Sequence, residues 1–402
     1  MWDYCGVMRR AFILPSERAG RQIMTAGTQG IHERAVKAAP VSWKVHTFSP
    51  VGSATNILNT QQSVEFLIPE GKLSEIEEIL LYYTISNSNT ASAALLMPTW
   101  FHCDQVEIEQ GGDLQETLYP EWEHFIHMAL RPTEWYTLVA ADLNIDTGYD
   151  EPAGTTIALS STDTYVMPLW TLFQQSDVPM HRLKGDIRIR FRFTTFANAE
   201  VTASCVAGDL TCTAMKLYIT DRHLKAPFDS QQAADHRDLI LPYLEVTREL
   251  VTTATTAGTR VDIKPASLSG NVAFVIIGDR VTAATNDTLL NFTALTDFTL
   301  KDPTGRIIGD VQQYPSALQR LELGSKLPNP AFLASIPYTI IPFTSDLVGT
   351  MLKGAQFGFE TLPTNSLINI NPATTATEDI MVIVGKYRHL RISNGKMTVI
   401  RA

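Results

Sequence analysis

The sequence predicts a mainly β fold made of two tandem sandwiches. From Val41 onward, short runs of β-branched and aromatic residues alternate with clusters of Gly, Pro, Asn, Asp and Ser, a pattern typical of many short strands. Long helical periodicity is scarce. The two halves of the chain also repeat one another, which indicates two domains of one topology.

Ten segments carry the strand pattern. In Asp186–Phe193 apolar residues alternate with Arg188, Arg190 and Arg192, so one face of this strand points to a core and the other to water or a partner. The expected strands are Ser63–Ile68, Glu78–Ser86, Gln105–Glu109, Thr155–Ser160, Asp186–Phe193, Ala214–Thr220, Asn271–Ile277, Phe298–Lys301, Gln356–Glu360 and Asp379–Val384.

Helix is expected as short inserts in this β protein. Ser16–Ala26 and Ile31–Ala39 lie in the N-terminal arm, and Leu118–Met128 lies in the first half. A further helical turn is expected at Ser316–Leu321.

Matching segments recur in the two halves. Thr164–Trp170 and Tyr338–Thr344 are each a short apolar strand that ends at proline and one bulky apolar residue. An alternating strand follows each of them, Asp186–Phe193 in the first half and Gln356–Glu360 in the second. Because the order of segments is shared as well as their type, we interpret the chain as a duplication.

A polar segment with turn residues separates the halves and indicates a linker. We therefore expect an N-terminal arm over residues 1–44, a first domain over 45–222, a linker over 223–237 and a second domain over 238–402. Each domain has the length of an eight-stranded sandwich with Greek-key connections.

Composition and charge exclude several functions. The 402 residues are 45% hydrophobic and 18% charged with a net charge of −10, which argues against disorder and against a general nucleic-acid binder. Residues 1–44 carry seven basic and three acidic side chains, a net charge of +4, so the remainder carries −14. A basic arm on an acidic body suits an anionic surface or a neighbour's acidic flank. Four cysteines without a C-x-x-C pair indicate reduced thiols in an intracellular product.

Two short segments point to a family. Val106–Asp113 alternates apolar and acidic residues, ends at a glycine turn formed by Gly111 and Gly112, and leads to a helical segment with Trp122. Asp238–Glu245 opens the second half. With the duplication, these segments make the chain resemble the major capsid proteins of the double jelly-roll lineage. Tailless membrane-containing phages, polinton-like viruses, virophages and nucleocytoplasmic large DNA viruses share this lineage.

The resemblance implies two eight-stranded jelly rolls and a structural role in a virion. It implies homotrimers of pseudo-hexagonal outline that tile an icosahedral shell after synthesis in the host cell cytoplasm. The implied partners are neighbouring capsomers, penton proteins and minor capsid proteins, without a cofactor, catalytic residues or sequence-specific nucleic acid. The family's N-terminal arms lie on the inner face of the shell, near minor proteins or an internal lipid membrane. The resemblance implies the same inner-face position for the arm of this chain, with Arg9, Arg10, Arg18 and Arg21.

The basic stripe of Arg188, Arg190 and Arg192 has two interpretations. It is a subunit interface that faces a neighbour's acidic edge, or it is a solvated sheet face.

Two functions from other classes remain as alternatives. A carbohydrate- or receptor-binding protein of a viral spike or tail would also be a β-sandwich protein. A β-sandwich glycosidase would use Glu107 and Glu109, which lie two residues apart on one strand face at about 7 Å, near the spacing of paired carboxylates in such enzymes. The third acidic position of one such family's motif is Gly112 here, so an acidic strand face is the simpler interpretation.

The histidines raise a weaker possibility of a metal site. His124 and His127 lie at i and i+3 on the expected helix, and His102 and Cys103 precede them on another segment. Imidazole nitrogens and a thiolate are zinc ligands. No H-E-x-x-H or paired C-x-x-C motif accompanies them, so packing or surface histidines are the simpler interpretation.

Overall fold

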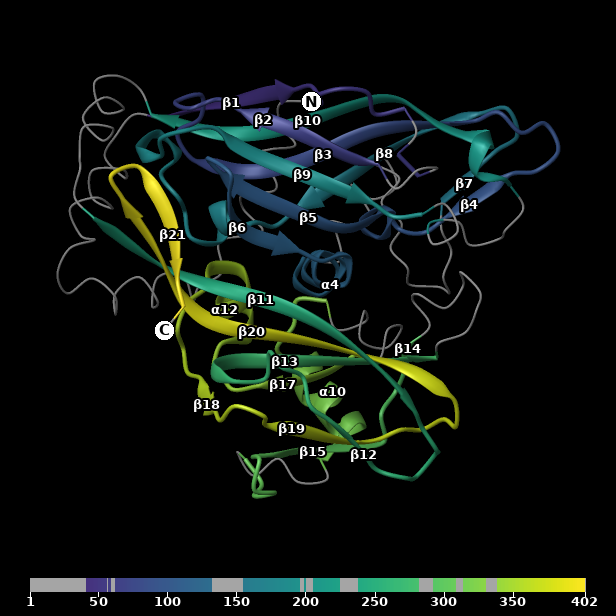
Figure 1. Cartoon of the computed structure of the whole chain (residues 1–402), viewed down its shortest axis with the longest axis vertical. Coiled ribbons are helices and arrows are strands. Elements are labelled where there is room, and N and C mark those ends of the chain that lie inside the picture. Colours follow the sequence, from purple (N-terminus) through teal and green to yellow (C-terminus); the bar gives the residue numbers. More distant parts are fainter. Residues whose placement is uncertain are drawn as a thin grey trace.

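The computed structural model describes residues 41–55, 57–58, 62–131, 155–195, 199, 205–224, 238–281, 292–308, 314–329 and 338–401. Over these residues the chain forms two β-sandwiches that lie one above the other along the longest axis (Figure 1). None of the helices in these residues is long and apolar enough to cross a bilayer.

The first sandwich consists of two four-stranded sheets. One has the strand order β1-β10-β3-β8 and the other the order β2-β9-β5-β6, with all pairs antiparallel. A two-stranded sheet, β4-β7, lies beside them. The elements are β1 (Val41–Phe48), β2 (Ser63–Ile68), β3 (Ile76–Asn87), β4 (Ala94–Leu96), η1 (Thr99–His102), β5 (Cys103–Gln110), β6 (Asp113–Leu118), α4 (Pro120–Leu130), β7 (Thr155–Ile157), β8 (Thr162–Leu169), α7 (Leu172–Gln175), η3 (Met180–Arg182), β9 (Ile187–Phe193), η4 (Ala207–Asp209) and β10 (Leu210–Leu224).

The second sandwich repeats this plan. Its larger sheet has the order β11-β20-β13, with β14, β17 and β18 all paired to β13 and β21 paired to β20. Its smaller sheet has the order β12-β19-β15-β16. The elements are β11 (Leu239–Ala254), β12 (Val261–Ile263), β13 (Gly270–Val281), β14 (Phe292–Thr293), β15 (Asp297–Lys301), β16 (Tyr314–Pro315), α10 (Ser316–Gly324), β17 (Thr339–Pro342), α12 (Leu347–Lys353), β18 (Glu360–Leu362), β19 (Leu367–Asn371), β20 (Thr377–Ser393) and β21 (Lys396–Ile400).

The duplication extends to the strand order. β1-β10-β3-β8 in the first half corresponds to β11-β20-β13-β17 in the second, and β2-β9-β5-β6 corresponds to β12-β19-β15-β16. Two sheets of four strands in this order make a jelly roll. The chain is therefore mainly β with two tandem jelly rolls, as the sequence predicts.

The helical inserts also correspond. α4 follows β6 in the first half, and α10 follows β16 in the second. The helix expected at Leu118–Met128 runs from Pro120 to Leu130, because proline fits the first helical turn, where its missing N–H is not needed. The turn expected at Ser316–Leu321 is a helix that continues to Gly324.

One expected strand is wrong and another is too long. Gln356–Glu360 is not a strand, because Gly358 has a φ of +130° and the strand begins only at Glu360. The counterpart of β9 in the repeat is β19 instead. Thr155–Ser160 ends as a strand at Ile157, and Ser160 lies in the left-handed region with a φ of 47°.

The borders between the parts of the chain also differ from expectation. β1 begins at Val41, inside the stretch expected as the arm, and pairs with β10 over its whole length. Residues 225–237 of the expected linker lie outside the described residues.

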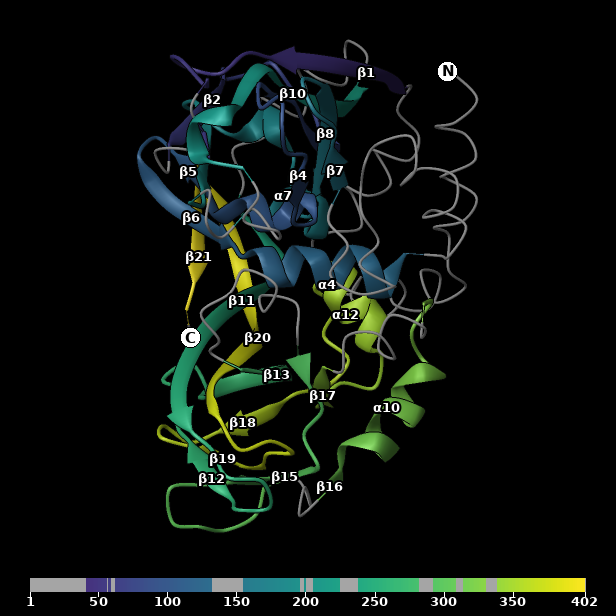
Figure 2. The ribbon, with the colours of Figure 1, turned by 90° about the vertical axis from the view of Figure 1, so that its right-hand side faces the viewer.

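Apolar packing joins the jelly rolls into one body. The second jelly roll has its own interior, formed by residues such as Val275, Val382 and Phe298. The opposite face of the same sheet, with Phe274 and Ile383, belongs instead to the large cluster that fills the first jelly roll. Both faces of the β11-β20-β13 sheet are therefore buried, and α4 lies against the outer one (Figure 2).

Two aromatic contacts anchor α4 on this sheet. Trp122 stacks on Phe274 with ring centroids 5.6 Å apart and an interplanar angle of 15°. Phe125 meets Tyr338 edge to face at 5.9 Å. Gly385 on β20 lies opposite Phe274, and a Cβ at this position would lie 2.4 Å from the Phe274 ring. The glycine therefore leaves the space that the ring fills.

The close approach at Gly385 makes a stability prediction. Gly385→Ala forces Phe274 away from Trp122, so we expect the free energy of unfolding in urea to fall by about 1–3 kcal/mol. Gly208→Ala is the matched control, because no atom lies within 4 Å of its added Cβ. A Gly385→Ala protein as stable as the wild type would contradict this packing.

Candidate functional site

The basic stripe lies within a ladder of ion pairs on the outer face of the β2-β9-β5 strands. Arg188, Arg190 and Arg192 on β9 alternate with Glu65 on β2 and with Glu107 and Glu109 on β5. The side chains interleave because paired residues of antiparallel strands point to the same face. Three arginines and three glutamates make this face neutral over these six residues.

Arg190 is the centre of the ladder. Its Nε lies 2.8 Å from Glu65 Oε1, and its Nη1 lies 3.2 Å from Glu107 Oε2 and 3.0 Å from Glu109 Oε1. Arg188 and Arg192 are more exposed, with 44% and 49% of their side chains accessible. The centre of the stripe is thus used within the chain, and its two ends face solvent.

The ladder bears on the glycosidase alternative. Arg190 bridges the carboxylates of Glu107 and Glu109, and Arg192 Nη2 lies 2.8 Å from Glu107. The carboxylate oxygens of both glutamates are thus used in pairing with arginines of the neighbouring strand. The arrangement is that of a structural ion-pair network.

His102 and Cys103, two of the weak metal-ligand candidates, are buried in the first jelly roll. Tyr83 Oη lies 2.5 Å from His102 Nδ1, and the Met97 carbonyl oxygen lies 2.7 Å from His102 Nε2. Burial lowers the pKa of His102 to about 4 and raises the pKa of the Cys103 thiol well above its usual value. Across the described ranges, no three His, Cys, Asp or Glu side chains lie close enough together to hold a metal ion.

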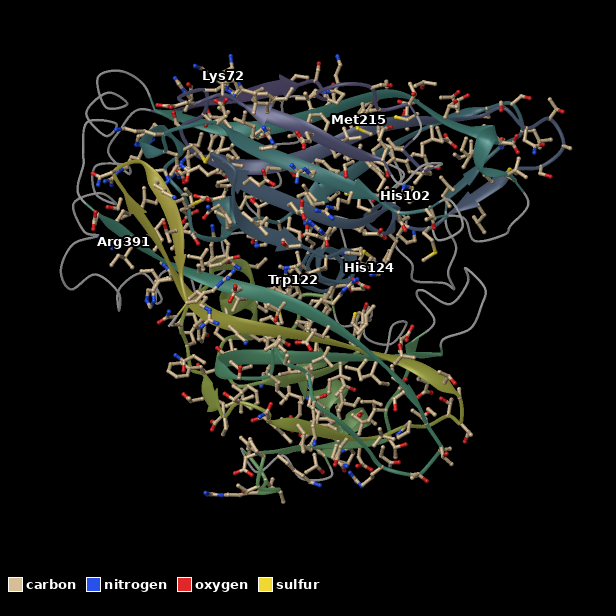
Figure 3. The ribbon with its side chains drawn as sticks, viewed as in Figure 1. Lys72, His102, Trp122, His124, Met215 and Arg391 are labelled. Atoms are coloured by element: carbon tan, nitrogen blue, oxygen red, sulfur yellow. The ribbon has the colours of Figure 1, made fainter. Side chains whose placement is uncertain are left out.

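His124 and His127 are packing residues of α4. Every residue of this helix is buried, so the i, i+3 histidine pair faces protein and not solvent. Trp100 stacks on His127 at 5.4 Å, and its ring centroid lies 5.5 Å from that of His124. Figure 3 shows His124 and Trp122 at α4, between the two jelly rolls. Burial lowers the pKa of His124 to about 3 and that of His127 well below its ordinary value, so both are neutral at physiological pH.

Polar contacts complete the junction between the jelly rolls. Glu116 on β6 accepts hydrogen bonds from the Leu172 N–H at 2.7 Å and from the Tyr243 hydroxyl on β11 at 3.2 Å. Burial raises the pKa of Glu116 to about 8. Arg248 on β11 donates from Nη1 to both carboxylate oxygens of Glu121 at 2.7 Å. The contacts of Tyr243 with Glu116 and of Arg248 with Glu121 join the second half to the first.

The β20-β21 hairpin reaches back to the first jelly roll. Gln110, at the end of β5, donates to the Lys184 and Gly395 carbonyls at 2.9 and 2.8 Å and accepts from the Met397 N–H at 2.7 Å. The adjacent turn of Gly111 and Gly112, with φ of +57° and +89°, joins β5 to β6. A buried glutamine therefore ties the C-terminal hairpin to the other half.

The expected arm contacts cannot be placed. Arg9, Arg10, Arg18 and Arg21 and both arm helices lie outside the described residues.

Solved structures share this architecture over nearly the whole chain. VP54 of PBCV-1, in a crystal structure fitted into a reconstruction of the virophage Sputnik, matches with a TM-score of 0.65 and 13% identity over 90% of this chain and 97% of VP54. The Faustovirus major capsid protein matches with a TM-score of 0.57 and 9% identity over 87% of this chain and 90% of its own. The chain has the double jelly-roll fold of viral major capsid proteins.

The mavirus major capsid protein also shares this double jelly-roll fold. It matches with a TM-score of 0.55 and 12% identity over 89% of this chain and 90% of its own. No family model and no curated protein matches the sequence. At these identities the likeness lies in the arrangement of the strands and not in particular side chains.

A pair of buried carboxyl groups lies at one end of the second jelly roll. Asp279 on β13 and Glu378 on β20 are both fully buried on the inner face of the sheet. Burial, and next the charge of Glu378, raises the pKa of Asp279 from 3.8 to about 7. Since two adjacent carboxylates repel in a low-dielectric interior, the pair retains a proton that the unfolded chain would release.

This pair predicts a loss of stability with rising pH. Because the pKa of Asp279 is raised in the folded state, the folded state holds a proton that the unfolded chain loses. The stabilisation that this proton gives is complete below about pH 4 and is lost as the pH rises through about 7. The proton of this pair changes the free energy of unfolding by at most about 1.4 kcal/mol per pH unit. We therefore expect Asp279→Asn to reduce the difference between the free energies of unfolding in urea at pH 5 and at pH 8.

Asp379→Asn is the matched control. Asp379 follows Glu378 on β20, so it lies on the opposite face of that strand from the buried pair. The same pH dependence in Asp279→Asn and wild-type protein would contradict the shared-proton account.

Proposed function

We propose that the chain is a major capsid protein that forms homotrimeric capsomers of pseudo-hexagonal outline in an icosahedral virion shell. The observation that carries this proposal is the duplicated jelly roll, with one strand order used twice in a single rigid unit. The likeness to the capsid proteins of PBCV-1, Faustovirus and mavirus over most of the chain supports it. Three copies of two similar units give six positions around one axis.

A structural role agrees with the side chains of the described residues. The paired glutamates are held by arginines, and His124 and His127 are packed in the core. Their chemistry serves cohesion between strands and between jelly rolls. The protein's function is thus assembly in the virion, without a catalytic step.

The partners follow from this role. Neighbouring capsomers, penton proteins and minor capsid proteins contact the trimer edges. The basic arm, with Arg9, Arg10, Arg18 and Arg21, meets minor proteins or an internal membrane on the inner face.

The mass of the purified protein tests the capsomer. We expect light scattering coupled to size exclusion to give three times 44.5 kDa, because the two jelly rolls of one chain supply only a third of a closed ring. A stable monomer under conditions that assemble shells would contradict the trimer. Glycan binding or hydrolysis by such a monomer would favour the spike or glycosidase alternative.

The exposed ends of the ion-pair ladder serve as the lateral contact in this proposal. Arg190→Glu is unsuitable as a test because it would place a fourth carboxylate among Glu65, Glu107 and Glu109. Arg192→Glu removes one ion pair, with Glu107, at a side chain that is 49% exposed, and leaves Arg190 to pair with all three glutamates. We expect it to leave the trimer mass unchanged and to reduce shell formation measured by sedimentation. Lys264→Glu, an exposed reversal outside the ladder, is the control, and normal shells from Arg192→Glu would overturn this role.

A further inference from the structure

The two corresponding helices differ in what covers them. α4 is entirely buried between the jelly rolls, whereas α10 exposes 53% of Leu318 and 74% of Leu321. The opposite side of α10 is held in place, since the Ile340 N–H donates to Gln319 Oε1 at 3.1 Å and Leu323 is buried. α10 is therefore a fixed helix with an exposed apolar pair.

The apolar pair of α10 occupies the positions of the α4 anchors. Trp122 and Phe125 are the third and sixth residues of α4, which starts at Pro120. Leu318 and Leu321 are the third and sixth residues of α10, which starts at Ser316. Residues three apart lie on one helix face, so both helices present an apolar pair in the same place.

The surface that α4 covers has its own counterpart. α4 packs on the outer face of β11-β20-β13-β17, where Phe274 lies opposite Pro342. In the first jelly roll Leu80 lies opposite Pro168, the next-to-last residue of the matching strand β8. Leu80 thus holds the place of Phe274 in the β1-β10-β3-β8 sheet.

The outer face of β1-β10-β3-β8 carries partly buried apolar residues, with the exposed Lys216 and the half-buried Glu78 among them. Leu80 and Tyr82 on β3 are half-buried, and Tyr82 meets Tyr218 on β10 edge to face at 6.0 Å. Val45 on the edge strand β1 exposes 65% of its surface. By contrast, Ile276 and Ile383 on the corresponding face of the second jelly roll are fully buried.

These observations define a donor helix and an acceptor face on one chain. We propose that α10 of one copy packs through Leu318 and Leu321 on the outer face of the β1-β10-β3-β8 sheet of the next copy. The contact repeats between chains the one that α4 makes within a chain. It rests on the trimer proposed above and specifies which surfaces form it.

The two helices lie in different places on the molecule. Figure 2 shows α4 running across the molecule between the jelly rolls, and α10 on the side of the second jelly roll opposite β11. A head-to-tail contact closes only if the rotation per step completes a circle. In this proposal the rotation from one jelly roll to the next is the same between chains as within a chain. Three chains then place six jelly rolls at equal rotations around the ring. Leucines bury less area than Trp122 and Phe125, so the contact between chains is the weaker one.

Charge reversal of both surfaces tests the proposal. We expect a Leu318→Glu, Leu321→Glu double variant to raise the trimer dissociation constant at least about 100-fold and to run near 44.5 kDa in light scattering. Val45→Glu, on the acceptor face, should do the same. Leu159→Glu is the control, since Leu159 is a 47% exposed leucine outside both surfaces, and it should remain trimeric.

The outcomes separate this contact from the trimer itself. A monomeric wild-type protein overturns the trimer and the contact with it. A trimeric wild type with a folded, trimeric α10 double variant overturns only the contact, as does a folded, trimeric Val45→Glu protein. Circular dichroism melting establishes folding. If the double variant does not fold, Val45→Glu decides, because it lies on a separate and more exposed element.

Discussion

The burial of α4 between the two jelly rolls is the contact on which the rest of the structure depends. An eleven-residue helix with both faces covered turns two sandwiches into one rigid body. Trp122 fits against Phe274 only because Gly385 has no side chain. Around this apolar centre, Arg248 pairs with Glu121, and Gln110 holds the C-terminal hairpin. The angle between the jelly rolls is therefore set by packing and not by the linker alone.

A fixed angle between two copies of one fold has a consequence for assembly. If the rotation from the first jelly roll to the second is repeated from one chain to the next, the geometry of one subunit determines the geometry of the ring. In that arrangement the strong interface is inside the chain and the weaker one between chains. Such a division suits a shell protein, which folds first and assembles afterwards.

Much of the fold was predictable, because strands with one buried face alternate visibly. The Asp186–Phe193 pattern became β9, and the helix at Leu118–Met128 became α4. Gln356–Glu360 failed because a glycine with positive φ interrupts an apparently alternating run. The sequence favoured packing or surface roles for His124 and His127, and both are buried; it could not choose between these roles, since a pattern does not show that both faces of a helix are covered. The partners of Arg190 and the roles of Gln110 and Gly385 depend on strand register and on contacts between halves, which local sequence does not contain.

In the proposed trimer, a helix packs on the next sheet in the same way within a chain, through α4, and between chains, through α10. A cryo-electron microscopy map of the purified oligomer tests this repetition most directly. We expect a threefold ring of six lobes in which α10 of each copy covers the outer face of β1-β10-β3-β8 of its neighbour. A ring in which α10 faces solvent, or in which that sheet face meets a different element, would contradict it.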